Sequence, residues 1–229
     1  MRIDRDRRYR GLRAVGLKTN RLDTLIDGVY AIALTLLVLD VKLPDGLSSI
    51  AAINLGLAGM LPKYGVYLIA FSSVALSWMC HHYYASLVVR TDFMHVFLNL
   101  AALMFIALVP FSAAAMGTYY YDSWAVAAFT LNMVVASLLY ALNWHHCVRY
   151  LLIENVHRSV LTFTVALIWA FVLTEAVAAG VAFLSPYAGI GVAACIIMLG
   201  FVFVAFLEPQ IIESRYRATI RTEEQIAPE

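Results

Sequence analysis

The chain has 229 residues, of which 62% are hydrophobic and 14% are charged, and its mean hydropathy is +0.79. Soluble domains have roughly 45–50% apolar and about 25% charged residues. The composition therefore excludes a disordered chain and argues against a water-soluble enzyme, and a net charge of +1 gives no field to attract nucleic acid. Cys80, Cys147 and Cys195 each stand alone in an apolar run, which indicates neither a disulfide framework nor a CxxC metal site. The sequence predicts an integral membrane protein.

Long uncharged runs predict an all-α integral membrane fold with six transmembrane helices per chain. A helix needs about 20 apolar residues to cross the ~30 Å hydrocarbon layer of a bilayer. The runs are long and lack the period-two alternation of barrel strands. The expected spans are residues 24–43, 62–84, 93–116, 122–147, 158–183 and 186–207.

Two features break this simple series. Residues 48–61 are apolar and short, and they are expected to form an amphipathic or re-entrant piece before the second span. Pro110 lies inside the third span, where a missing amide proton should kink the helix or mark its end. Pro62 and Pro186, in contrast, stand at span starts, where proline costs little.

The basic residues predict the orientation. Eight of the sixteen lie within residues 1–21, and with six spans fourteen fall on one side of the membrane against two, Lys42 and Lys63, on the other. The positive-inside rule then places both termini in the cytosol. The expected organisation is a basic cytosolic segment at 1–22, a six-helix transmembrane domain at 23–208 and a cytosolic tail at 209–229.

The first span carries acidic residues at its start. Asp23 and Asp27 are four residues apart, so they face one way near the cytosolic mouth of the helix. Charge at membrane depth is expensive and tends to face a bundle interior or a water-filled path. The alternative is a local role, with Asp23 as helix cap and Asp27 in the first turn.

Further along the same span, Ile32, Leu36 and Leu39 fall at i, i+4 and i+7, which is one stripe of a helix. Thr35 borders the stripe, with a hydroxyl that can bond its own backbone or face water. From periodicity alone, the stripe is either a packing surface or the lining of a pore.

Two blocks of sequence, in order, resemble the transmembrane protein 175 family of potassium channels. That family's first signature reads approximately R-x-x-x-F-S-D-G-V-F-A-I-A-x-T-L-L. The matching string here is Arg21-x-x-x-Leu25-Ile26-Asp27-Gly28-Val29-Tyr30-Ala31-Ile32-Ala33-x-Thr35-Leu36-Leu37. The second block reads Trp78-x-x-His81-His82, then Asp92, Asn99 and Pro110-Phe111. One departure is that Leu25-Ile26 replace the family's Phe-Ser, which removes a hydroxyl near the cytosolic entrance.

The resemblance implies a potassium-preferring cation channel and not an enzyme. Prokaryotic members have one six-helix unit per chain and assemble as homotetramers, in which the first helix of each unit lines the pore. The implied location is a bacterial cytoplasmic membrane. The implied partners are further copies of the chain, membrane lipid, and K⁺ and other monovalent cations, with no nucleic acid and no cofactor beyond the permeant ion.

Carried over by position, the resemblance makes Ile32 the narrowest ring of the pore and Leu36 and Leu39 further apolar rings, with Thr35 influencing selectivity. An apolar constriction dewets when closed. The acidic residues expected to attract cations are Asp23 and Asp27 at the cytosolic mouth and Asp40 outside. The residues expected to form a polar network that braces the first helix are Arg21, Trp78 and His81 or His82.

Two other function classes stay open at this point. Glu175 is an acid inside the apolar fifth span, and it suits a proton-coupled secondary transporter, an intersubunit hydrogen bond or a lipid-facing position. The pairs His81-His82 and His145-His146 could serve a membrane metalloenzyme, although they lack the i, i+4 spacing of such sites. The further ligands that a metal centre could recruit are His95, His157, Glu154 and Glu175.

Overall fold

The computed structural model describes residues 19–42, 45, 49–88, 90–150 and 158–226. Every regular element in this part of the chain is helical, in agreement with the predicted all-α fold. Most of the basic segment predicted at 1–22 lies outside the described residues, as do Glu154 and His157. The elements are α2 (Thr19–Leu37), η1 (Val38–Asp40), α3 (Ile50–Gly59), α4 (Leu61–Ala85), α5 (Phe93–Thr118), α6 (Ser123–Tyr150), α7 (Arg158–Leu184) and α8 (Pro186–Ile226).

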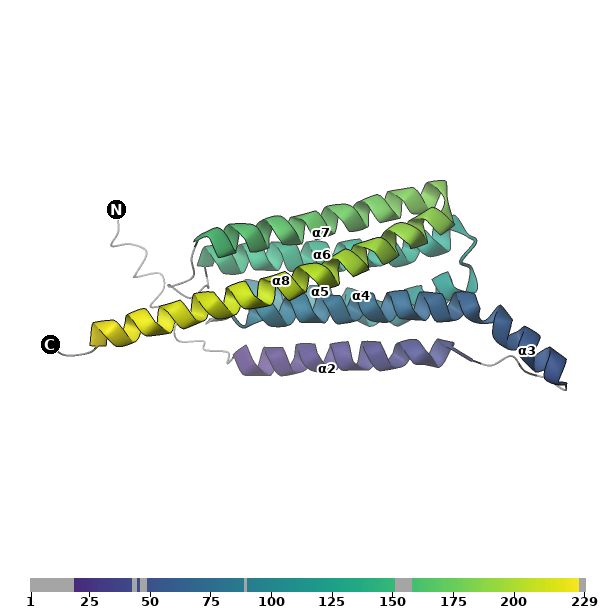
Figure 1. Ribbon diagram of the computed structural model, residues 1–229, viewed down its shortest axis with the longest axis horizontal. Helices are drawn as coiled ribbons and strands as arrows, with labels where there is room; N and C mark the ends of the chain where they lie inside the picture. Colours follow the sequence, from purple (N-terminus) through teal and green to yellow (C-terminus); the bar gives the residue numbers. More distant parts are fainter. Residues whose placement is uncertain (1–18, 43–44, 46–48, 89, 151–157, 227–229) are drawn as a thin grey trace.

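Six of these helices are long and apolar enough to cross a membrane. They are α2 with η1, α4, α5, α6, α7 and α8, and Figure 1 shows them side by side along one axis. The start of α2 and the end of α8 lie at the same end of the bundle, as an even number of crossings requires. The prediction of six spans is confirmed, and the chain is a multi-pass membrane protein.

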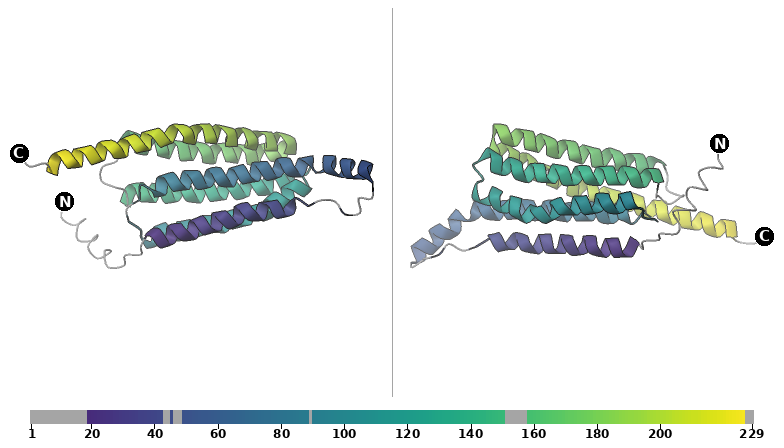
Figure 2. Two further views of the ribbon diagram at one scale, coloured as in Figure 1. Left: turned by 60° about the horizontal axis from the view of Figure 1, so that its bottom comes forward. Right: turned by 180° about the vertical axis from the view of Figure 1, so that it is seen from behind.

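Two helices extend beyond the bundle, at opposite ends (Figure 2). The short piece expected at 48–61 is α3, which the Ser49 hydroxyl caps by accepting from Ala52 N at 3.2 Å. None of its residues is buried. At the other end α8 continues to Ile226, past the expected end of the last span at 207. Its 41 residues correspond to about 62 Å, twice the hydrocarbon thickness of a bilayer, so its last part projects from the membrane.

Helix α5 runs through Pro110 to Thr118, so the third span does not end at the proline. A proline in a helix has no N–H to donate to the carbonyl four residues earlier, which here is that of Ile106. Here Asn132 on α6 donates its amide Nδ2 to the Phe105 carbonyl at 3.0 Å. This bond lies one residue before the carbonyl that Pro110 leaves without its backbone donor, and it joins α6 to α5 beside the proline turn.

We expect Asn132→Ala to lower the free energy of unfolding by about 1 kcal/mol, the usual size of an interhelical hydrogen bond in a membrane protein. Unfolding in mixed detergent micelles, followed by circular dichroism, measures the change. Asn54→Ala, on the exposed helix α3, is the matched control and should have little effect. Equal losses in the two variants would mean that the Asn132 bond does not stabilise the contact between α5 and α6.

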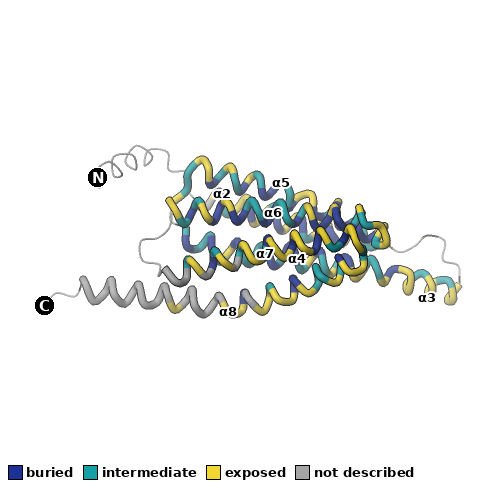
Figure 3. Tube along the Cα trace, turned by 90° about the horizontal axis from the view of Figure 1, so that it is seen from above, coloured by how far each residue is buried: buried dark blue, intermediate teal, exposed yellow. Residues whose placement is uncertain are grey.

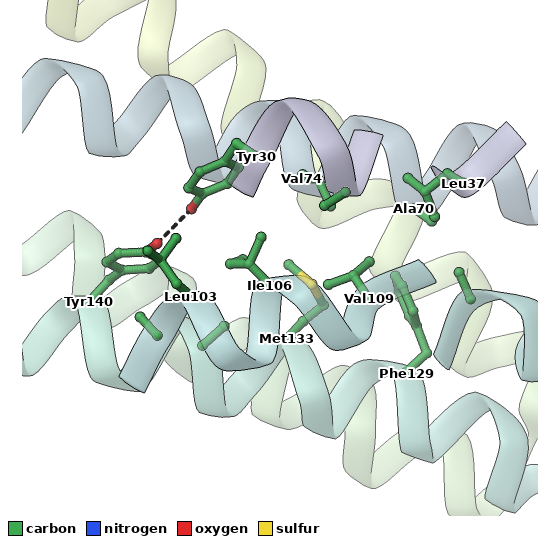
Figure 4. Close-up of a cluster of buried hydrophobic side chains, with 14 of the residues drawn as sticks. Tyr30, Leu37, Ala70, Val74, Leu103, Ile106, Val109, Phe129, Met133 and Tyr140 are labelled. Carbon is green, nitrogen blue, oxygen red and sulfur yellow. Dashed lines mark hydrogen bonds between the residues drawn. The ribbon is translucent and has the colours of Figure 1, made fainter. Parts of the chain in front are cut away.

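The core is built around one face of α2. Leu22, Ile26, Tyr30, Ala33 and Leu37 recur at helical spacing and are all buried. Figure 4 shows part of this face directed at apolar side chains of its neighbours. The partners labelled there are Ala70 and Val74 on α4, Leu103, Ile106 and Val109 on α5, and Phe129, Met133 and Tyr140 on α6.

Two glycines allow helices to approach closely in the second half of the bundle. A Cβ atom on Gly189 would lie 2.7 Å from the Ala182 backbone, and one on Gly200 would overlap the Leu76 side chain. Small residues permit such contacts in membranes, where packing replaces the hydrophobic driving force. Gly200 therefore holds α8 against α4 at this level.

Candidate functional site

Helix α2 has a second face that no other part of the described chain covers. The exposed fractions are 59% for Ile32, 43% for Leu36 and 60% for Leu39, and Thr35 is exposed with them. Figure 3 colours the bundle by burial, and along α2 buried and exposed residues recur with the helical period. The predicted stripe is therefore not a packing surface within its own chain. We call these four residues the α2 outer face.

Thr35 uses its hydroxyl locally. It donates to the backbone carbonyls of Ala31 and Ile32, at 3.0 and 2.9 Å. This bond leaves the lone pairs of the hydroxyl oxygen directed away from the helix, where they can accept from water or contact a cation. Thr35 is thus a polar position on an otherwise apolar outer face.

At the first turns of α2, Asp27 joins the helix to α4. Trp78 Nε1 donates to Asp27 Oδ1 at 2.9 Å, and the His82 ring stacks on Trp78 with centroids 5.4 Å apart. Asp27 is exposed while Asp23, one turn earlier, is partly buried. The carboxylate of Asp27 is oriented by the indole and still reaches the surface of the bundle.

Only part of the predicted polar network around the first span forms. His81 is buried and turned the other way, with its Nδ1 2.5 Å from the Tyr84 hydroxyl and its ring against Tyr140. Arg21 is exposed and makes no hydrogen bond or ion pair with the described residues. The structure joins Trp78 and His82 with Asp27, and it separates His81 and Arg21 from them.

A second link between α2 and the bundle is the Tyr30 hydroxyl, which the sequence analysis did not identify. It donates to the Tyr140 hydroxyl at 3.0 Å and lies 2.8 Å from Ser77 Oγ. The side chain is fully enclosed, and Figure 4 shows it reaching from α2 to α6. The available signal was a hydroxyl-bearing side chain in the middle of an apolar helical stripe, since a buried tyrosine hydroxyl needs a partner.

The polar residues of the second sequence block lie between α5 and α6. Asp92 caps α5 by accepting from His95 N at 2.8 Å, and its other oxygen lies 2.8 Å from His146 Nε2. Behind it, His95 Nδ1 is 2.9 Å from Asn143 Oδ1, and Asn99 Nδ2 donates to the His95 carbonyl. These groups hold the two helices together at one end of the bundle.

Asp40 lies at the opposite end of α2 from Asp27, about 20 Å along the helix. It is partly buried and shares a small pocket with Lys63 and Gly117. Its carboxylate therefore faces its own chain, and a basic side chain on α4 lines the same pocket.

Glu175 is 8% exposed and accepts a hydrogen bond from Ser137 Oγ at 2.6 Å, which links α7 to α6. It is thus an internal residue, in contrast to the lipid-facing alternative. Across the described residues, no three histidine, cysteine or acidic side chains gather closely enough to hold a metal ion. His81, His82 and His146 contact aromatic rings, and His146 also contacts Asp92.

Comparison with known proteins gives a family match over the part of the chain just described. The family model of the endosomal/lysosomal potassium channel TMEM175 matches residues 21–110. This segment runs from the start of α2 to Pro110 in α5, and it includes the α2 outer face, Asp27, Trp78 and His82.

Relatives of this chain carry the name potassium channel. One, from Streptomyces collinus, is 35% identical over 138 residues, which is 58% of this chain and 66% of the relative. Another, from Chamaesiphon minutus, is 36% identical over 104 residues, which is 44% of this chain and 51% of the relative. The chain thus matches about half to two thirds of the length of these relatives.

A solved structure extends the similarity to the whole bundle. It is the crystal structure of a lysosomal potassium-selective channel TMEM175 homolog from Chamaesiphon minutus, with a TM-score of 0.74 and 25% sequence identity. The match covers 81% of this chain and 97% of that one. The helices after residue 110, which the family model does not reach, therefore also follow this fold.

Proposed function

Because this chain belongs to the TMEM175 family, we propose that it forms a potassium-preferring cation channel that conducts passively across a membrane. The observation that carries the proposal is the α2 outer face. Its side chains are large, apolar and exposed at the level where the helix crosses the membrane, and the chain's own bundle does not cover them.

In the proposed assembly, four copies place their α2 helices around a central axis. Ile32 and Leu36 then form successive apolar rings, with Leu39 one turn further along. A narrow apolar ring excludes water when closed, which blocks ions without a charged barrier. When the ring widens, an entering cation still sheds part of its hydration shell. Potassium holds its water less tightly than sodium, so the constriction favours potassium, although modestly.

The two ends of α2 supply the charge that attracts cations. Asp27, exposed and oriented by Trp78, and Asp23 one turn earlier raise the local cation concentration at the cytosolic mouth. Asp40 contributes more weakly at the other mouth, because its carboxylate faces its own chain and Lys63 lines the same pocket. The cytosolic mouth is therefore the more strongly cation-attracting of the two.

The contacts between α2 and the rest of the bundle make this helix suited to gating. Its buried face packs on α4 and α5, and two polar contacts, Asp27 with Trp78 and Tyr30 with Ser77 and Tyr140, set its height and rotation. Because the outer face is on the same rigid helix, a small rotation about these contacts changes the width of the apolar rings. The proposed location is the bacterial cytoplasmic membrane with both termini cytosolic, as the distribution of basic residues predicts.

The test is a reversal potential. The purified protein is reconstituted in a planar bilayer with potassium on one side and sodium on the other. We expect discrete openings and a reversal potential displaced toward the potassium equilibrium value, by about 59 mV for a tenfold preference. A flux that saturates and requires a proton gradient would indicate a transporter, and no current at any voltage would contradict the channel.

A further inference from the structure

A cavity of about 80 Å³ lies inside the bundle, between α4, α6, α7 and α8. None of the site residues described above on α2 lines it. Its largely apolar lining includes Leu76 and Cys80 on α4, Leu87 just after α4, Thr164 and Phe171 on α7, and Val204 on α8.

The wall of this cavity presents almost only carbon. Its polar side chains are engaged elsewhere: Ser137 donates to Glu175, the Tyr84 hydroxyl contacts His81, and Ser77 contacts Tyr30. Apolar cavities of this order, up to about 150 Å³, stay dry and accept apolar ligands. The chemistry of the lining thus selects a hydrocarbon and disfavours water or an ion.

The cavity runs along α4 from Leu76 toward Leu87, near one end of the bundle. Gly200 brings α8 onto Leu76 of α4 at one end of the cavity. Its other end reaches Leu87, beyond the last turn of α4, and Cys80 and Tyr83 on this wall are partly exposed. Arg90 follows three residues after Leu87 and is exposed, so a cation stands at the end where a lipid headgroup would lie.

The back wall of the cavity is also the support of α2. Ser77 and Tyr140 both line it, and they are the two hydrogen-bond partners of the Tyr30 hydroxyl. A molecule in the cavity therefore contacts the residues that hold the helix bearing the outer face. It does so from the side opposite to that helix.

We propose that this cavity binds an acyl chain of an anionic phospholipid, with the headgroup beside Arg90 and the chain against Cys80 and Ser77. The bound acyl chain fills the space behind Ser77 and Tyr140. It therefore keeps their hydrogen bonds to the Tyr30 hydroxyl in place. The regulatory part, control of the α2 helix by lipid, rests on the proposed channel function. The binding part stands without it.

The binding test uses phosphatidylglycerol that carries a photoreactive diazirine in its acyl chain. The full-length protein in vesicles is irradiated, and the labelled peptides are identified by mass spectrometry. We expect label to concentrate on residues 76–87 and 164–171. Cys80→Phe, which fills the cavity, should reduce this label several-fold. Cys195→Phe, at an exposed position on α8, should leave it unchanged.

Label spread evenly over the lipid-facing helices would overturn the binding proposal, as would label at these peptides that persists in folded Cys80→Phe. If Cys80→Phe fails to fold, the wild-type map alone decides between concentrated and even labelling. Bilayer recordings of the same variants test regulation: Cys80→Phe should shift open probability with unchanged conductance. Concentrated label without current in any variant would reject the channel and keep the lipid site, whereas normal current with even labelling would do the reverse.

Discussion

Ile32→Ala is expected to raise single-channel potassium conductance several-fold and to increase the current at rest. The isoleucine side chain is 59% exposed on α2, and four copies would form the narrowest apolar ring of the proposed pore. Truncation to alanine widens the ring and lowers the cost of keeping it wet. Single-channel recording in planar bilayers measures both quantities, and potassium-over-sodium preference should fall as the ring widens.

The control for Ile32→Ala is Leu199→Ala. Leu199 is 67% exposed on α8, which packs on α4, α6 and α7, so it matches Ile32 in exposure and in the kind of change. It should leave conductance unchanged. If Ile32→Ala and Leu36→Ala both conduct like the wild type, the α2 outer face does not line the pore.

Tyr30→Phe is expected to lower the free energy of unfolding by about 1–2 kcal/mol and to change open probability. The substitution keeps the ring that fills the core and removes the hydroxyl that contacts Tyr140 and Ser77. Both partners then remain in a low-dielectric interior without it, which is the costly outcome for a buried polar group. Unfolding in mixed micelles gives the stability, and bilayer recording gives the open probability.

A double-mutant cycle separates the hydroxyl contact from other effects of Tyr30→Phe. Tyr140→Phe and the double variant should show a coupling energy of about 0.6–1.7 kcal/mol. Tyr187→Phe, an exposed tyrosine on α8, is the control and should change little. Additive losses for Tyr30 and Tyr140 would mean that their contact does not stabilise α2.

The positions of His81 and His82 could be predicted only in part from the sequence. His81 and His82 are adjacent, and adjacent residues on a helix point about 100° apart. One of them therefore stacks on Trp78 near the surface while the other enters the core beside Tyr84 and Tyr140. Helical geometry predicts that they separate, but only the packing of α4 decides which one is internal.

The boundaries of the helices followed from the sequence for a simple physical reason. A bilayer of fixed thickness demands long uncharged runs, and charges or turn residues must end them. The last helix is the exception, since α8 continues to Ile226 after it leaves the hydrocarbon. Nothing in the lipid limits a helix there, and most of the expected tail at 209–229 is therefore a continuation of the helix.

By itself, the sequence determined the membrane class, the number of crossings and the stripe on which Ile32, Leu36 and Leu39 lie. Only the tertiary structure decided that this stripe is uncovered and that the opposite face, with Ile26 and Tyr30, enters the core. Both faces of α2 are apolar, and lipid chains are as apolar as leucine, so hydropathy cannot distinguish a packed face from an exposed one. The distinction comes from shape and from the Tyr30 hydrogen bonds, which exist only when α4 and α6 are in place.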